Sequence, residues 1–309
     1  MVIPTQKYLP DWHLCAARLA DAESVRRVKL LEELLTLRLE RKCAEVVAIF
    51  HAEQNDWNQT LHIMLLRSMG GGRNTMQLER LARLATARIC MREASSVEKI
   101  EALLLGASGL LEREFFDDYI LRLKEEFDFL ARKYSLRPMM AGEWDRCRTF
   151  PMGNPVMRLA QAAALVASPA VRFDNIIRCS TVGDLRRTFD VSASTYWTEH
   201  LLPDSASRSG SGRMGNDRID SIGINLVVPL MFAASVIDGG EALKIRALNL
   251  LETIGAERNS KIARWQSAGV VPQNAFDSQA LLEQSRYCSD GVCGECLLAK
   301  QLKITTFTD

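Results

Sequence analysis

Helical periodicity runs through almost the whole chain and is the feature that most restricts its fold. Between Val25 and Val46, apolar residues recur at intervals of three, four or seven positions, which places them on one face of a helix. No alternation of apolar and polar residues, the pattern of a half-buried strand, is longer than four positions. The segments 270–272 and 304–307 are the only weak strand candidates. The sequence therefore predicts an all-α fold, a multi-helix orthogonal or bundle array in two layers or subdomains with negligible β structure.

Capping residues and glycines divide this pattern into helices. The first long helix is predicted from Ser24 to about Ala52, and Asp56 is predicted to cap the next one. The triple glycine at 70–72 is a helix stop; no strand precedes it and no Lys-Ser/Thr follows it, so a phosphate-binding loop is disfavoured. Ser95 and Glu98 have the spacing of a capping box. The small residues 106–109 predict close packing against a neighbouring helix.

A change of composition near the middle of the chain predicts two subdomains. The segment 136–153 is rich in Pro, Met, Gly and Arg, and Pro155 follows it at the expected start of a helix. We therefore predict an N-terminal helical subdomain at 1–135 and a C-terminal one at 136–309. The Ser/Gly/Arg-rich segment 203–216 is the candidate for a long flexible loop.

The overall composition is that of an ordinary globular protein. The 309 residues are 47% hydrophobic and 25% charged with a formal net charge of +1, which argues against disorder and against general attraction to polyanions. The longest apolar run, around Ile224–Val236, is shorter than the about 18 residues that span a membrane, so we predict a buried helix and no membrane partner. The first residues do not have the pattern of a signal peptide, and we expect a cytoplasmic protein with reduced thiols.

Three of the eight cysteines lie close together near the C-terminus. Cys288, Cys293 and Cys296 form a C-x4-C-x2-C pattern. Two thiolates separated by two residues can bind one metal, because a tight turn points both sulfurs the same way. Gly291 and Gly294 would allow that turn. We predict that these three cysteines are metal ligands.

The identity of the metal is left open by the spacing. Zinc is favoured, and an iron–sulfur cluster is the second alternative, since C-x4-C-x2-C with a distant cysteine is one ferredoxin-type pattern. Both require a fourth ligand, for which the candidates are Cys15, Cys147, Cys179 and His200. A redox or disulfide pair and plain reduced thiols are further alternatives. A metal at this position is expected to stabilise the last two helices rather than to do chemistry.

Polar residues within apolar or capping positions form a second group of candidates. Tyr196 and His200 share a helix face, and Asn225 lies in an apolar segment. For each alone, capping or core hydrogen bonding is the simpler interpretation. Together they could line one polar pocket. The candidate binding residues are Arg158, Gln161, Tyr196, Trp197, His200, Asn225, Glu257, Asn259, Asp277 and Gln279.

Arginine is concentrated in one part of the chain. Between Arg137 and Arg218 there are eleven arginines, no lysine and eight acidic residues. Arginine is favoured where proteins contact phosphates, but the net excess of three charges is small, and arginine-rich genomes give the same bias. Contact with nucleic acid is therefore one explanation for these arginines, and the composition of an arginine-rich genome is the alternative.

The order of short motifs along the chain resembles the bacterial domain of unknown function 2851. No single motif is specific, and the resemblance lies in their succession over nearly the whole chain. The motifs are LRLERK at 37–42, NDW at 55–57, EALLLGASGLL at 101–111, RLAQ at 158–161, YW with His200, IN at 224–225, ERN at 257–259, DSQAL at 277–281 and the terminal YC-x4-C-x2-C.

This resemblance implies a family without an assigned activity. It also implies that members carry a preceding β-rich region with acidic, histidine and tryptophan motifs, loosely suggestive of a nuclease. This chain begins near the start of the helical part, so we expect a fragment, a split gene product or a shortened member. If the family is catalytic, the resemblance places its active residues in the missing region.

The sequence predicts a helical binding or scaffold module that is metal-stabilised at its C-terminal end and is not itself catalytic. Its expected partners are nucleic acid or the partner domain implied at the N-terminus. The first alternative is an enzyme, hydrolytic or nuclease-like, with a pocket around Arg158, His200 and Asn225. The second alternative is an iron–sulfur protein.

Overall fold

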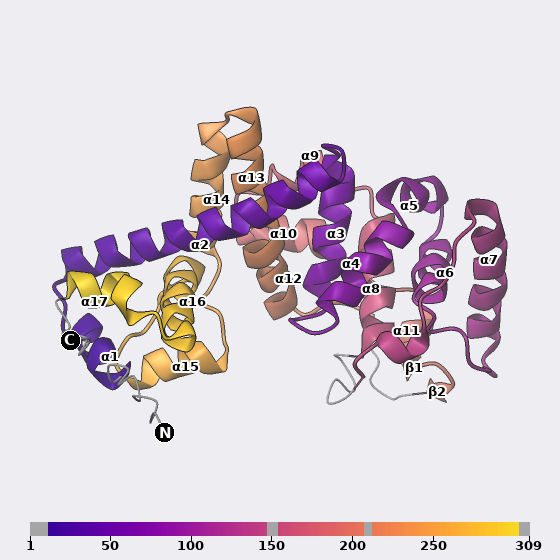
Figure 1. The fold of residues 1–309 in the computed structure, drawn as a ribbon. Helices are drawn as coiled ribbons and strands as arrows, with labels where there is room; N and C mark the ends of the chain where they lie inside the picture. The colour runs from indigo at the N-terminus through magenta and orange to yellow at the C-terminus, as the bar shows by residue number, and fades with distance from the viewer. Residues whose placement is uncertain (1–11, 147–153, 207–211, 303–309) are drawn as a thin grey trace, which may run out of the picture. The chain divides into compact units, whose positions relative to one another are not determined.

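The computed structural model describes residues 12–146, 154–206 and 212–302, and in these the fold is all-α as predicted (Figure 1). Contacts between residues divide the chain into two units. Unit 1 comprises Met1–Glu45 and Ala247–Asp309, and unit 2 comprises Val46–Arg246. The predicted boundary at residue 135 does not coincide with this division. It lies inside unit 2, where one helix packs against neighbours from both sides of that boundary.

Unit 1 is built from both ends of the chain. Its helices, including the two that continue into unit 2, are α1 (Trp12–Ala20), α2 (Ser24–Ala52), α14 (Glu241–Thr253), α15 (Ser260–Ser267), α16 (Ala275–Asp290), the 3-10 turn η3 (Cys293–Glu295) and α17 (Leu297–Gln301). Figure 1 shows the indigo α1 beside the yellow α17, at opposite ends of the sequence, and the two helices are in contact.

Unit 2 holds the remaining elements. They are α3 (Trp57–Met69), α4 (Thr75–Leu84), α5 (Ala87–Glu93), α6 (Val97–Ala107), α7 (Asp118–Tyr134), η1 (Ala141–Glu143), α8 (Pro155–Ala167), α9 (Phe173–Ile176), α10 (Val182–Phe189), α11 (Tyr196–Glu199), β1 (His200–Leu202), β2 (Ser205–Ala206), α12 (Asn216–Ile222), the π-helical η2 (Gly223–Val227) and α13 (Val228–Asp238). The strands β1 and β2 pair as a short antiparallel hairpin, and β2 lies in the segment predicted to be a flexible loop.

Helix α6 forms the centre of unit 2 and packs against both α7 and α8. The close approach depends on Gly106, because a Cβ there would lie 2.0 Å from the ring of Phe127. This confirms the predicted tight packing of the small residues. The helix is capped by Ser96, whose hydroxyl accepts from the backbone N–H of Lys99 at 3.2 Å; the prediction of Ser95 as the cap was wrong by one residue.

A buried carboxylate links α6 to the segment that carries α11. Glu101 has no exposed surface and accepts hydrogen bonds from the hydroxyl of Tyr119, from the backbone and hydroxyl of Ser194, and from the indole of Trp197. Burial raises the pKa of Glu101, and these hydrogen bonds act in the opposite direction. All four donors converge on one side chain, which therefore holds three segments of unit 2 together.

The segment from Asn216 to Asp238 is long and apolar enough to cross a membrane by length and composition, which differs from the expectation that no segment is. In the structure it is the continuous run of α12, η2 and α13, and 72% of its most apolar window is buried. A core helix passes the same length test. This burial agrees with the predicted core helix around Ile224–Val236.

Asp56 caps helix α3 as predicted, and its carboxylate accepts from the backbone N–H groups of Asn58 and Gln59 at 2.8 and 3.1 Å. Helix α3 also carries a buried histidine, His62, which makes the stability of the protein depend on pH. The His62 side chain is 4% exposed and donates from Nε2 to the carbonyl oxygen of Ala85 at 2.8 Å. Burial lowers the pKa of His62 from 6.5 to about 4.

We expect the free energy of unfolding to fall on acidification from pH 6.5 towards pH 4. In this range the unfolded chain binds a proton at His62 that the folded chain does not, so stability rises with pH and is lost as pH decreases. The loss attributable to His62 is roughly 3 kcal/mol. Urea unfolding at several pH values would measure it. In a His62→Gln variant this part of the pH dependence should disappear; an unchanged pH profile would contradict the assignment.

Candidate metal centre

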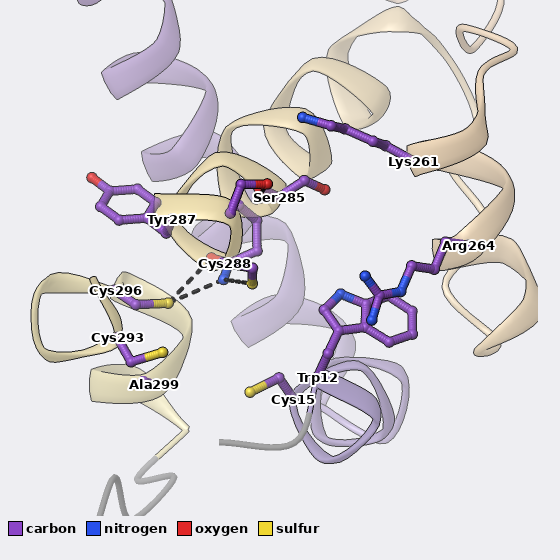
Figure 2. Close-up of a pocket in the computed structure, with 12 residues that line it drawn as sticks. Trp12, Cys15, Lys261, Arg264, Ser285, Tyr287, Cys288, Cys293, Cys296 and Ala299 are labelled. Atoms are coloured by element: carbon purple, nitrogen blue, oxygen red, sulfur yellow. Dashed lines mark hydrogen bonds between the residues drawn. The ribbon is translucent and has the colours of Figure 1, made fainter. Parts of the chain in front are cut away.

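Four cysteine side chains line one cavity of about 260 Å³ in unit 1. Cys288 lies in the last turn of α16, Cys293 begins η3, Cys296 caps α17 and Cys15 lies on α1. Figure 2 shows the four sulfurs around one common space, with Cys15 approaching from the side opposite Cys293 and Cys296. The described lining residues are Trp12, Cys15, Lys261, Arg264, Gln284, Ser285, Tyr287, Cys288, Ser289, Cys293, Cys296 and Ala299.

The turn that joins α16 to α17 places the three C-terminal cysteines. Gly291 ends α16 with a φ of +69°, a conformation that glycine adopts without strain. The chain then closes through a hydrogen bond from the N–H of Cys296 to the carbonyl of Cys293 at 3.1 Å. Gly291 therefore has the predicted role. Gly294 does not, because it lacks a positive φ and a Cβ there would enter open space.

A buried amide connects two of the sulfurs. Gln284 has no exposed surface, and its Nε2 lies 3.0 Å from the Sγ of Cys296 and 3.8 Å from the Sγ of Cys288. An N–H donor pointed at sulfur stabilises the thiolate form and orients a ligand. Gln284 therefore acts on both cysteines at once.

Cys288 and Cys293 lie in partly buried surroundings that favour their protonated form, while two cations line the same cavity. Burial raises the pKa values of Cys288 and Cys293, and the neighbouring thiols raise them further. Arg264 lowers the pKa of Cys288 and lies over the ring of Trp12 at 3.9 Å. The second cation is Lys261. Thiolates that lie close together repel one another. A cationic metal centre bound by all of them would offset this repulsion, and the two positive side chains would add to that effect.

The cavity is larger than a single ion requires. Within the described ranges, no group of three histidine, cysteine or carboxylate side chains is arranged to hold a metal ion. A cavity needs only about 10–15 Å³ to accept one water-sized sphere, and this one measures about 260 Å³. Zinc bound by four thiolates has Zn–S distances of about 2.3 Å.

Comparison with known families identifies the chain. The model of DUF2851, a protein family of unknown function, matches residues 4–260. The chain belongs to the DUF2851 family. The matched region includes Cys15 and ends before Cys288, so the family match does not extend over the three C-terminal cysteines. No curated protein and no solved structure matched this DUF2851 chain.

Of the four predicted candidates for a fourth ligand, Cys15 is the one that lines the cavity in this DUF2851 protein. Cys179 and His200 belong to unit 2, and Cys179 is buried beside the hydroxyl of Thr188 at 3.6 Å. Cys147 lies outside the described residues. Sequence spacing could not rank these candidates. One sequence signal for Cys15 was its spacing from Trp12. The two residues are three positions apart, so they share a helix face, and both line the cavity.

The predicted polar residues of unit 2 have local partners. Arg158 donates to Gln161 at 2.9 Å, and Gln161 donates to the carbonyl of Arg213 at 3.4 Å. Asn225 donates to the carbonyl of Ser221 at 3.0 Å within the π-helical turn. Tyr196 donates to Asp117 and stacks on His200 with ring centroids 4.0 Å apart. Trp197 belongs to the Glu101 network described above.

The predicted polar residues of unit 1 fall into a cap and a buried network. Asn259 caps α15, and Asp277 accepts from the backbone of Gln273 at the start of α16. Gln279 donates to Glu257 at 2.6 Å and accepts from Arg38 at 2.6 Å. The ten predicted binding residues are thus divided between the two units, and each side chain has a partner close to it.

Proposed function

We propose that this DUF2851 protein is a helical binding module whose unit 1 holds an iron–sulfur cluster. Its ligands are Cys15, Cys288, Cys293 and Cys296. The observation that carries the proposal is that four cysteines from two ends of the chain line one cavity. Four cysteine thiolates are the usual ligand set of such clusters.

Three further observations favour a cluster over zinc. The cavity has room for several metal and sulfide atoms. The pattern C-x4-C-x2-C with one distant cysteine occurs in ferredoxin-type sites. The amide of Gln284 and the cations Lys261 and Arg264 supply a donor and positive charge beside the sulfurs, which suits a cluster with a net negative charge.

The main role of the cluster is to stabilise the fold of unit 1. When bound, it supplies four metal–thiolate bonds and a one-electron redox couple. The bonds join α1 to the last turn of α16 and to α17. Because metal bound only by the folded state adds to folding stability, the two ends of the chain are held together by cofactor as well as by packing.

The test is metal analysis of protein purified without oxygen. We expect iron and acid-labile sulfide in equal amounts, about four of each per chain for a cubane cluster, with a brown colour that bleaches on reduction. About one zinc per chain without sulfide would overturn the cluster and indicate a structural zinc site. Absence of both metals, also after anaerobic reconstitution with iron and sulfide, would overturn the metal centre altogether.

A further inference from the structure

Among the partly buried arginines of unit 2 that form no ion pair with the described residues are Arg158 and Arg218. Arg158 lies in the first turns of α8 and Arg218 in the first turn of α12. Arg158 donates to the side-chain oxygen of Gln161, which is neutral. Arg218 donates from Nη2 to the carbonyl oxygen of Ser68 at 2.6 Å, in the last turn of α3. Neither guanidinium forms an ion pair among the described residues.

The two arginines come from neighbouring elements, because α3, whose Ser68 accepts from Arg218, packs against α8, which carries Arg158. Burial lowers the pKa of both, and Arg158 lowers the pKa of Arg218 further, to about 10. No carboxylate raises either pKa. The segments 147–153 and 207–211, which the structure does not describe, contain no Asp or Glu. The positive charge is therefore not balanced by this unit's own acidic side chains.

Other arginines of unit 2 have their own acceptors. The partly buried Arg172, for example, donates to the carbonyl oxygens of Val166, Ser168 and Val171. Arg113, Arg186 and Arg213 each lie beside an aspartate, respectively Asp204, Asp220 and Asp190. A buried charge without a partner is costly, and proteins normally pair it or neutralise it. Arg158 and Arg218 have no carboxylate, and the Nε of Arg218 has no acceptor, so a bound anion would supply both the missing charge and the missing acceptor.

An unused donor lies in the same place. The Nε of Arg218 is buried and has no hydrogen-bond partner. The backbone of Gly71, which has a φ of +57°, passes close to the same guanidinium group, because a Cβ there would lie 3.4 Å from Nη1 of Arg218. A buried donor is normally satisfied, so an acceptor from outside the protein fits this position.

We propose that Arg158 and Arg218 bind a phosphate group. Guanidinium groups present planar donors that match phosphate oxygens and keep their charge at physiological pH. A doubly charged phosphate would balance both arginines and accept from the orphaned Nε. The phosphate is either that of a small molecule or that of a nucleic-acid backbone, and the chemistry of the contact is the same.

Thermal unfolding with inorganic phosphate tests the first source. At equal ionic strength, phosphate should raise the melting temperature of the wild type relative to chloride, and this shift should be lost in Arg158→Gln. That variant leaves the bond from Arg218 to Ser68 intact. Arg137→Gln, at an exposed arginine of the same unit, is the matched control and should keep the shift.

Binding to a short DNA duplex tests the second source. If the duplex supplies the phosphate, Arg158→Gln should raise the dissociation constant about tenfold or more, as expected for loss of a charged hydrogen bond, and Arg137→Gln should not. An effect in either experiment that is specific to Arg158 supports the proposal. Equal behaviour of the wild type, Arg158→Gln and Arg137→Gln in both experiments overturns it.

Discussion

Replacement of Cys15 by alanine is expected to remove most of the iron and sulfide from the purified protein. The thiol is one of four that line the cavity and comes from a different helix than the other three. Loss of an outer-shell partner alone typically lowers metal affinity about 10- to 100-fold, and loss of a direct ligand should lower it at least as much. The melting temperature should fall too, because metal binding contributes to folding.

Cys43→Ala is the matched control for this experiment. Cys15 and Cys43 are both 6% exposed, and both belong to unit 1, but Cys43 does not line the cavity. The two variants lose the same atom from equally buried positions. We expect Cys43→Ala to keep the wild-type iron and sulfide content. If Cys15→Ala also kept it, Cys15 would not be a ligand and the four-cysteine site would be wrong.

The sequence predicted the helical fold well because its signals are local. The apolar residues between Val25 and Val46 lie on one face, and the structure has the helix from Ser24 to Ala52. The hairpin at 200–206 was missed because strands of three and two residues are too short to show alternation. The division into units was missed for a related reason. Helix α2 runs through residue 45 without a break in its periodicity, so no linker marks the change.

The sequence predicted the part of the candidate metal centre whose cysteines are close together in the chain. Cys288, Cys293 and Cys296 lie within nine positions, and their spacing alone indicated a shared turn. Cys15 was one of four equal candidates, because sequence separation says nothing about which distant residue returns to the turn. The packing of Trp12 against Trp265, with ring centroids 5.1 Å apart, brings α1 to the cavity. That contact is tertiary and has no sequence signature.

The Glu101 network was missed because its acceptor lies within an apolar helix. Trp197 was predicted as a binding residue, yet its indole donates to Glu101 at 3.0 Å and it has no exposed surface. A single acidic residue at the start of EALLLGASGLL resembles an ordinary solvent-facing position. Its donors, Tyr119, Ser194 and Trp197, come from two other segments of unit 2.

Replacement of Glu101 by alanine is therefore expected to lower the free energy of unfolding by about 3–5 kcal/mol. The substitution leaves the indole N–H of Trp197 and the backbone N–H of Ser194 buried without their acceptor, and it opens a cavity in the centre of unit 2. Urea unfolding followed by circular dichroism would measure the loss. Glu101→Gln keeps the shape and one acceptor oxygen, and should lose less.

Glu98→Ala provides the comparison for a carboxylate on the same helix that faces solvent. Glu98 is exposed in the first turn of α6, so its replacement should cost about 0.5 kcal/mol or less. The contrast between the two glutamates separates loss of the buried network from loss of helix-terminal charge. If Glu101→Ala destabilised the protein no more than Glu98→Ala, the carboxylate would not hold α6 to Tyr119, Ser194 and Trp197 in solution.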